Sequence, residues 1–142
     1  MWWRSIDLGS QRLTSRLLHG DPPGRAAIAA ARAEVDRYLE DFEPRQPRTA
    51  FAVGGSARAL KRIVGPRLDE QSFEEALEVL ARTTADELAG QYDIAPERAP
   101  TLAAGAVILA GIQQRLGTPL KVVRGGLRDG AIADQAARRA VA

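Results

Sequence analysis

Cysteine is absent from this 142-residue chain, and histidine occurs once, at His19. Without a thiol the chain can form neither a disulfide nor a zinc–thiolate site, and it has no cysteine nucleophile. His19 also lacks a second histidine with which to build a conventional zinc site. Nothing in this inventory requires an oxidising compartment, so we expect a cytoplasmic protein.

A strong charge of one sign and long apolar runs are also lacking. Twenty lysines and arginines face eighteen aspartates and glutamates, which leaves a formal net charge of +2. This balance does not favour bulk attraction to nucleic acid or to a membrane surface. The longest apolar stretch, residues 101–112, is too short to cross a bilayer, and the start does not resemble a signal peptide. We expect a soluble, non-exported protein with neither membrane nor nucleic acid as partner.

Aromatic side chains are few, at 5% of the residues, so the core should be mostly aliphatic. Hydrophobic residues make up 45% of the chain and charged residues 27%, as in ordinary globular proteins. A chain of this length can bury a real core. The sequence therefore predicts one domain over residues 1–142.

A glycine turn between a predicted strand and a helix is the most informative local motif. The apolar residues 49–53 lead into Gly54 and Gly55, and a helix follows directly. Backbone N–H groups of Gly54, Gly55 and Ser56, together with the helix dipole, can hold a phosphate group. The Ser56 hydroxyl and the Arg58 guanidinium could add contacts. In the alternative interpretation the glycines only allow close packing, Ser56 caps the helix, and Arg58 is solvated.

The remaining pattern alternates strands with helices and predicts an α/β fold. Strands are expected at residues 3–8, 49–53 and 119–124, and the last turns through Gly125-Gly126 into a helix at 127–141. Helices are expected to begin at a Ser10 cap, at an Asp21 cap with Pro22-Pro23 in the first turn, at capping boxes Ser72–Glu75 and Thr84–Glu87, and at Pro100. Helix ends are expected at Gly65-Pro66 and at a Gly117 cap. The small residues Ala103, Ala104, Gly105 and Gly111 indicate tight packing of that last helix.

Three segments, in this order, resemble the C-terminal half of the exopolyphosphatase and guanosine pentaphosphate phosphatase family (Ppx/GppA). They are residues 5–14 with Asp21-Pro22-Pro23; residues 53–57; and Arg98-Ala99-Pro100 with Ala104-Gly105-Ala106, ending in residues 126–130. The resemblance implies the C-terminal part of the second RNase H-like domain of an actin-like, two-domain protein. The truncated sheet would contain about three parallel strands with flanking helices.

The resemblance also implies part of a phosphoanhydride hydrolase that releases terminal phosphate from polyphosphate or guanosine pentaphosphate. The family's catalytic glutamate and its other phosphate-binding turns are not found in this sequence, so no catalytic residue is assigned and the isolated chain is expected to be inactive. Magnesium is implied by the family, with its site mainly outside this chain. The alternatives are a non-catalytic module that binds phosphate or a nucleotide, and a helical interaction domain with purely structural glycines.

Other charged residues have two interpretations each. Lys61, Arg62 and Arg67 either guide a long polyanion or form a solvated helix face. Arg98 and Arg128 lie in segments that match the family, and bracing of helix ends explains them equally well. Asp7 either helps to hold magnesium or accepts N–H groups of its turn.

The missing part of the domain leads to an expectation about partners. In the RNase H-like pattern, a central strand absent from this chain would separate the strand at 3–8 from that at 49–53. The first strand therefore either pairs directly with 49–53 or leaves an open edge that recruits a second chain. We expect a homodimer or a re-paired sheet, besides a missing N-terminal domain as the natural partner.

Overall fold

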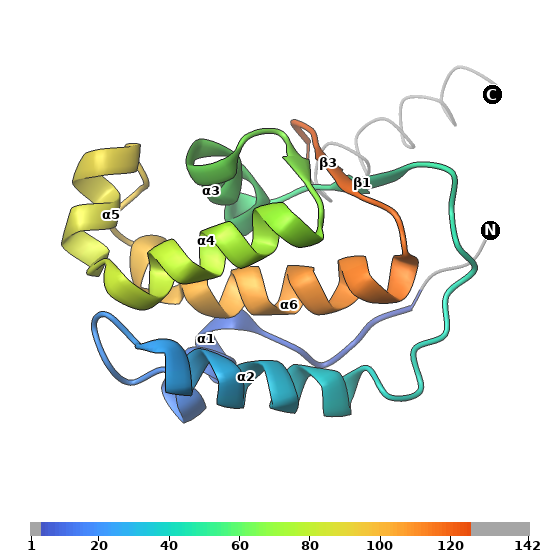
Figure 1. Ribbon diagram of the computed structural model, residues 1–142, viewed down its shortest axis with the longest axis horizontal. Helices are drawn as coiled ribbons and strands as arrows, with labels where there is room; N and C mark the ends of the chain where they lie inside the picture. The colour runs from blue at the N-terminus through green and yellow to red at the C-terminus, as the bar shows by residue number, and fades with distance from the viewer. Residues whose placement is uncertain (1–3, 126–142) are drawn as a thin grey trace, which may run out of the picture.

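A helix of small and apolar residues lies at the centre of the structure, a computed structural model that describes residues 4–125 (Figure 1). This helix, α6 (Leu102–Leu116), buries Leu102, Ala103, Ala104, Gly105, Ala106, Val107 and Gln113. A helix that is apolar on several faces must be covered by other elements. It is contacted by α1 (Ser10–Leu17), α2 (Arg25–Tyr38), α3 (Gly55–Val64) and α4 (Glu70–Arg82).

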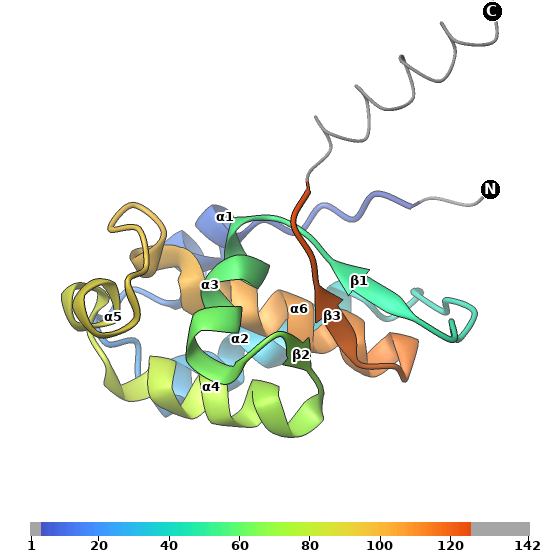
Figure 2. The ribbon, with the colours of Figure 1, turned by 90° about the horizontal axis from the view of Figure 1, so that it is seen from above.

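A small mixed sheet lies beside this helical layer. It contains β1 (Ala50–Ala52), β2 (Arg67–Leu68) and β3 (Leu120–Val122), in the order β1-β3-β2 (Figure 2). β1 and β3 run parallel, with Ala52 opposite Val122, whereas β2 is antiparallel to β3. The predicted α/β fold with flanking helices is confirmed. The expectation of parallel strands only is corrected, because the two-residue β2 adds an antiparallel pair.

The predicted strand at residues 3–8 is wrong for its described part, residues 4–8, which forms no strand. This segment makes its polar contacts with the turn after α2 and with α1 instead. Arg4 Nη1 donates to the Asp41 carbonyl oxygen at 2.8 Å, and Asp7 accepts from Arg12 Nη1 at 2.6 Å. β1 pairs with β3 alone, so the re-paired sheet is also wrong in the described chain. The expected homodimer stays a prediction.

Two capping motifs determine where the middle helices begin. For α5 (Ala85–Tyr92) the predicted Thr84–Glu87 capping box is confirmed, with the Thr84 N–H donating to Glu87 Oε2 at 2.9 Å. For α4 the box is formed by Asp69 and Ser72, so the predicted Ser72–Glu75 pair is wrong by one turn. Asp69 accepts the Ser72 N–H at 3.0 Å and is therefore the true N-cap.

The first two helices begin at glycines rather than at the predicted side-chain caps. Gly9 is the N-cap of α1, and Ser10 is the first helical residue. Gly24 is the N-cap of α2, with φ of 81°. Asp21 instead accepts the backbone N–H of Ala85 at 2.8 Å and so satisfies a donor at the start of α5. Its acceptor oxygen serves a helix distant in sequence.

The end of α6 and the tight packing of its small residues agree with the sequence. Pro100 lies in a 3₁₀ turn (Ala99–Thr101) just before α6, and Gly117 ends the helix with φ of 62°. A Cβ added at Gly111 would lie 2.8 Å from Val35 Cγ1, so α2 and α6 approach closely there. No described helix has both the length and the hydropathy of a membrane span. The predicted helix at 127–141 lies outside the described residues.

Candidate phosphate-binding site

The predicted glycine turn connects the end of β1 to the start of α3. Gly54 has φ of 109° and ψ of 176°, a conformation that L-residues rarely adopt, and it is the N-cap of α3. Among residues 4–125, no side chain caps this helix. The first helical backbone bond is donated by Arg58 N–H to the Gly54 carbonyl oxygen, at 3.1 Å. The N–H groups of Gly55, Ser56 and Ala57 therefore remain for another acceptor.

An arginine from a distant segment lies against this turn. A Cβ added at Gly55 would lie 2.7 Å from Arg98 Nη2 and 2.8 Å from both Cζ and Nε. The guanidinium thus occupies the space that any larger residue at position 55 would need. Arg98 is half-buried, and its side chain makes no ion pair or hydrogen bond within residues 4–125. The structure thereby brings a cation with several N–H donors to the uncapped helix start.

This combination distinguishes α3 from the other helices. The α4 and α5 starts carry capping boxes and acidic residues in their first turns, which occupy the N–H groups and repel anions. The α1 and α2 starts also lack side-chain caps. A Cβ added at their N-cap glycines, Gly9 and Gly24, would meet nothing within 4 Å, whereas the Arg98 guanidinium lies against the first turn of α3 at Gly55. Sequence reasoning treated Arg98 as a possible brace, because its distance from Gly55 depends on tertiary folding.

Ser56 faces helix α6 with its side chain. A Cβ added at Gly105 would lie 2.5 Å from Ser56 Oγ and 2.8 Å from Ser56 Cβ. The hydroxyl therefore lies in the contact between α3 and α6 and does not cap α3. The backbone N–H of Ser56 is still at the uncapped helix start. Its side chain positions the turn by packing against α6. The predicted hydroxyl contribution to phosphate binding stays a prediction.

We expect Gly105→Ala to destabilise the protein by about 1–2 kcal/mol, because overpacking outweighs the higher helix propensity of alanine. The added methyl group would overlap with the Ser56 Cβ, whose position is fixed by the backbone. Chemical denaturation measures the loss. Ser56→Gly in the same chain should recover most of it, and additive losses from the two substitutions would show that these residues do not compete for space.

The remaining cations near the turn differ in their availability. Arg58 and Lys61 are exposed on α3, and neither forms an ion pair in the part of the chain that the structure describes. The two others predicted as part of this basic surface lie close to acids: Arg62 Nη1 is 2.5 Å from Asp93 Oδ2, and Arg67 Nε is 3.7 Å from Asp69 Oδ2. Arg98 and Arg58 are therefore the arginines best placed for a ligand at the turn.

The other sequence candidates lie apart from the turn. Asp7 pairs with Arg12 and does not belong to a strand end. His19 borders a cavity with Asp21 and Pro100, which is lined by α1 and the loop after it, by α4 and α5, and by the start of α6. Within residues 4–125 no three Asp, Glu or His side chains gather closely enough to hold a metal ion. Arg128 lies outside the described residues.

An exposed apolar row begins next to the glycine turn. It consists of Phe51, Val53 and Val123, whose exposed fractions are 62%, 51% and 36%. The alternate residues Ala50, Ala52 and Leu120 are buried toward the helices. β1 is at one edge of the sheet (Figure 2) and has a strand partner on one side only among the described residues. Both this edge and the exposed row could contact another domain or chain.

Comparison with known proteins places this geometry in a known fold. No model of a protein family matches the chain. A solved Ppx/GppA family member from Aquifex aeolicus matches 92% of the chain and 47% of its own, with a TM-score of 0.82 and 17% identity. A solved exopolyphosphatase-like protein matches 95% of the chain and 50% of its own, with a TM-score of 0.80 and 24% identity. The fold is thus the actin-like fold of Ppx/GppA proteins.

Curated sequences lead to the same group of proteins. Exopolyphosphatase 1 of Mycobacterium leprae is 33% identical over 120 residues, which are 73% of this chain and 35% of that protein. Exopolyphosphatase 1 of Mycobacterium tuberculosis is 29% identical over 145 residues, which are 90% of this chain and 42% of that protein. The chain is therefore a relative of the exopolyphosphatases of the Ppx/GppA family, as the sequence motifs predicted. It spans 35–42% of the length of these curated relatives.

Proposed function

We propose that this chain supplies a phosphate-binding turn to a hydrolase that releases terminal phosphate from inorganic polyphosphate. The observation that carries the proposal is the Arg98 guanidinium against Gly55, at a helix start that no side chain caps. A phosphate oxygen at this place would accept backbone N–H groups from α3 and charge-assisted hydrogen bonds from Arg98. Arg58, on the same first turn, would contact a neighbouring phosphate of the chain-like substrate.

The catalytic groups of this hydrolase are proposed to lie outside the chain. Cleavage of a phosphoanhydride needs a positioned water, a base and cations on the transferred phosphoryl group. The resemblance assigns the base to a glutamate of the missing N-terminal domain and Mg²⁺ mainly to residues outside this chain. The edge of β1, which has no strand partner among the described residues, and the exposed apolar row support a junction with further structure. The working protein would be a cytoplasmic, two-domain enzyme.

Polyphosphate is the first choice of substrate because the curated relatives are named exopolyphosphatases. Guanosine pentaphosphate presents the same terminal phosphates and would use the same turn. A non-catalytic module that binds phosphate or a nucleotide would also need only the geometry around Gly55 and Arg98. Binding tests the turn, and activity in a two-domain context separates an enzyme part from such a module.

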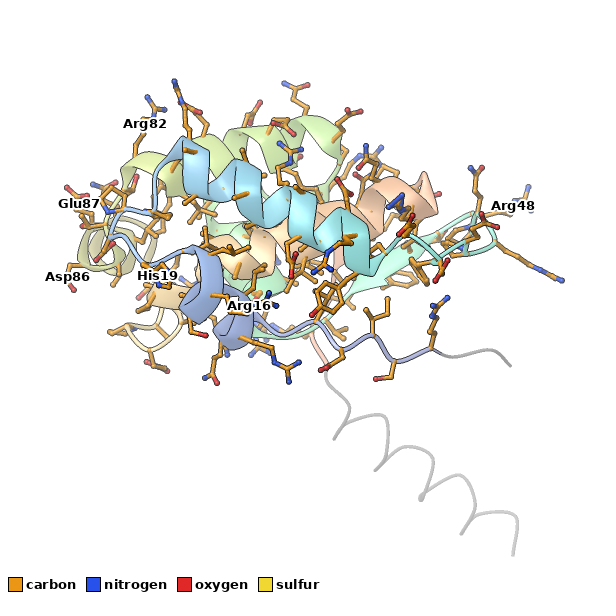
Figure 3. The ribbon with its side chains drawn as sticks, turned by 90° about the horizontal axis from the view of Figure 1, so that it is seen from below. Arg16, His19, Arg48, Arg82, Asp86 and Glu87 are labelled. Carbon is orange, nitrogen blue, oxygen red and sulfur yellow. The ribbon has the colours of Figure 1, made fainter. Side chains whose placement is uncertain are left out.

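Titration calorimetry with tripolyphosphate tests the binding step. We expect Arg98→Ala and Arg58→Ala each to weaken binding by about 1–3 kcal/mol, or roughly five- to 150-fold, the range of a charge-assisted contact. Arg48→Ala is the matched control, since Arg48 is exposed in the loop that leads into β1, before the strand rather than after it (Figure 3). It removes the same charge, and binding should change little.

If all three variants lose the same binding affinity, binding depends on net charge alone, which contradicts a defined site. Unchanged tripolyphosphate binding in Arg98→Ala would show that this side chain only stabilises the helix ends. A comparison of guanosine pentaphosphate with tripolyphosphate in the same assay then ranks the two substrate classes. Preference for the nucleotide without any hydrolysis in the two-domain protein would favour the regulatory module.

A further inference from the structure

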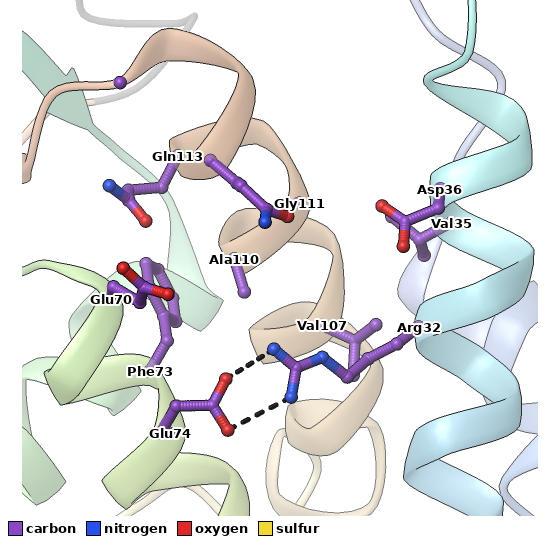
Figure 4. A pocket seen from close by; sticks show the side chains of 12 residues that line it. Arg32, Val35, Asp36, Glu70, Phe73, Glu74, Val107, Ala110, Gly111 and Gln113 are labelled. Atoms are coloured by element: carbon purple, nitrogen blue, oxygen red, sulfur yellow. Dashed lines mark hydrogen bonds and ion pairs between the residues drawn. The ribbon is translucent and has the colours of Figure 1, made fainter.

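A cavity of about 240 Å³ lies between α2, α4 and the C-terminal half of α6 (Figure 4). It does not include any residue of the glycine turn, so it is separate from the proposed phosphate site. Its apolar lining comes from all three helices: Val35, Phe73, Val107, Ala110 and Gly111. Polar and charged side chains of the same helices surround this apolar floor.

One cation among these side chains is already paired. Arg32 on α2 donates two hydrogen bonds to the Glu74 carboxylate on α4, one of them from Nη1 to Oε2 at 3.1 Å. The hydrogen bond from Arg32 lowers the pKa of Glu74, so this acid is charged at neutral pH. The pKa of Arg32 is raised mainly by the hydrogen bond with Glu74, and the charges of Asp36 and Glu70 raise it further. Three acids therefore surround one arginine.

The other two carboxylates lie on opposite walls of the cavity. In Figure 4, Glu70 projects from α4 on one side and Asp36 from α2 on the other, with Val107 and Ala110 of α6 between them. Glu70 forms no ion pair within the described part of the chain. Asp36 Oδ1 is 3.8 Å from Arg115 Nη2, at the outer limit of an ion pair. The lining thus offers two separated anionic groups across an apolar floor.

An unpaired amide of a largely buried residue lines the same cavity. Gln113 is only 9% exposed, and its side chain makes no hydrogen bond within residues 4–125. The buried, unpaired side-chain atoms of the described residues do not include this amide, so it is open to the cavity and its water. A ligand that displaces such water keeps its affinity only if it replaces the hydrogen bond. Because Gln113 lines the cavity beside Glu70, an N–H donor bound there would satisfy its carbonyl oxygen. A glutamine amide can donate or accept, and beside two carboxylates its carbonyl oxygen favours a ligand that donates hydrogen bonds.

We propose that this cavity binds a short aliphatic diamine. One ammonium group would pair with Glu70 and donate to Gln113 Oε1, the other would pair with Asp36, and the methylene chain would cover Val107 and Ala110. A phosphate would meet two carboxylates, and an apolar ligand would leave Gln113 unpaired. Two acids separated by an apolar floor also suit two linked cations better than a single metal ion. This proposal does not depend on the phosphate-binding function.

Thermal unfolding with butane-1,4-diamine, compared with butylamine at equal ionic strength, tests the proposal. The diamine should raise the melting temperature in a saturable way, since a ligand of the native state stabilises it. Butylamine, with one ammonium group, should bind at least roughly tenfold more weakly. Chemical-shift changes in nitrogen-edited NMR spectra should centre on Gln113 and Ala110.

Three variants separate this site from general attraction of cations. Glu70→Gln and Gln113→Leu should each weaken diamine binding about tenfold, the effect of one charge-assisted hydrogen bond. Glu75→Gln, on the same helix but outside the cavity lining, should bind as the unchanged protein does. Equal responses to both amines, or equal losses in Glu70→Gln and Glu75→Gln, would overturn the proposal, as would shift changes that avoid Gln113.

Discussion

The isolated chain is expected to release no phosphate from polyphosphate in the presence of Mg²⁺, even where it binds the polymer. Its described residues provide N–H groups at α3 and the guanidinium groups of Arg58 and Arg98, which in the proposed function would hold a charged substrate. None of these groups is a base for the attacking water. General acid–base catalysis alone accounts for roughly a hundred- to ten-thousandfold in rate. Its loss, together with that of substrate positioning by the missing domain, removes measurable turnover.

A chimera tests whether phosphate-releasing activity appears when the absent part is supplied, in addition to its absence in the isolated chain. The part of Mycobacterium leprae exopolyphosphatase 1 that this chain does not match would be joined to it, and phosphate release would be followed colorimetrically. We expect activity in the chimera and a large decrease when Arg98→Ala is added. The Arg48→Ala chimera is the control and should keep its activity. Phosphate release by the isolated chain at the rate of the chimera would contradict the proposed division of labour.

The sequence predicted those features that depend on local chemistry. The glycine turn is an example, since a positive φ at Gly54 and the helix that follows require only neighbouring residues. The Gly117 C-cap and the Thr84–Glu87 box are similar cases. In each of these motifs, the residue with the special conformation and its hydrogen-bond partner are only a few positions apart in the sequence. These motifs therefore identified the start of α3 and of α5 correctly.

The errors arose where a partner distant in sequence decides the structure. Residues 4–8 have apolar residues at alternate positions, yet a strand needs a neighbouring strand, and their polar contacts are with α1 and the turn after α2 instead. Asp21 resembles a local cap but accepts the N–H of Ala85, which only folding brings near. β2 is too short to leave an alternating pattern. Tertiary contacts outweighed local preference at each of these positions.

The candidate site shows the same division. Gly54, Gly55, Ser56 and Arg58 were predicted from one continuous motif, and the structure places all of them at the start of α3. The position of Arg98 over Gly55 required the 3₁₀ turn and α6 to be in place. The only sequence signal for it was its location in a segment similar to the exopolyphosphatase family. The packing of Ser56 against Gly105 likewise depends on two helices that are separated in sequence.

Leu60→Ala is expected to lower the free energy of unfolding by about 2–5 kcal/mol, the usual cost of deleting a buried leucine side chain. Leu60 is 0% exposed on α3, the helix that carries the glycine turn. Because small domains are stable by only about 5–15 kcal/mol, this change removes a large part of the total. Urea denaturation followed by circular dichroism measures it. The variant should also bind tripolyphosphate more weakly, since α3 no longer holds its start rigidly beside Arg98.

Phe51→Ala is the matched control for this loss, because it also deletes a large apolar side chain, from a position that is 62% exposed in the single chain. A surface substitution of this kind changes stability by about 0.5 kcal/mol or less. If it costs as much as Leu60→Ala, the exposed row formed by Phe51, Val53 and Val123 is covered in solution by the expected second copy. The loss would then grow with protein concentration, and sedimentation equilibrium would show a dimer that Phe51→Ala dissociates. A small, concentration-independent loss together with a monomeric protein would instead contradict the homodimer and leave this row for the missing domain.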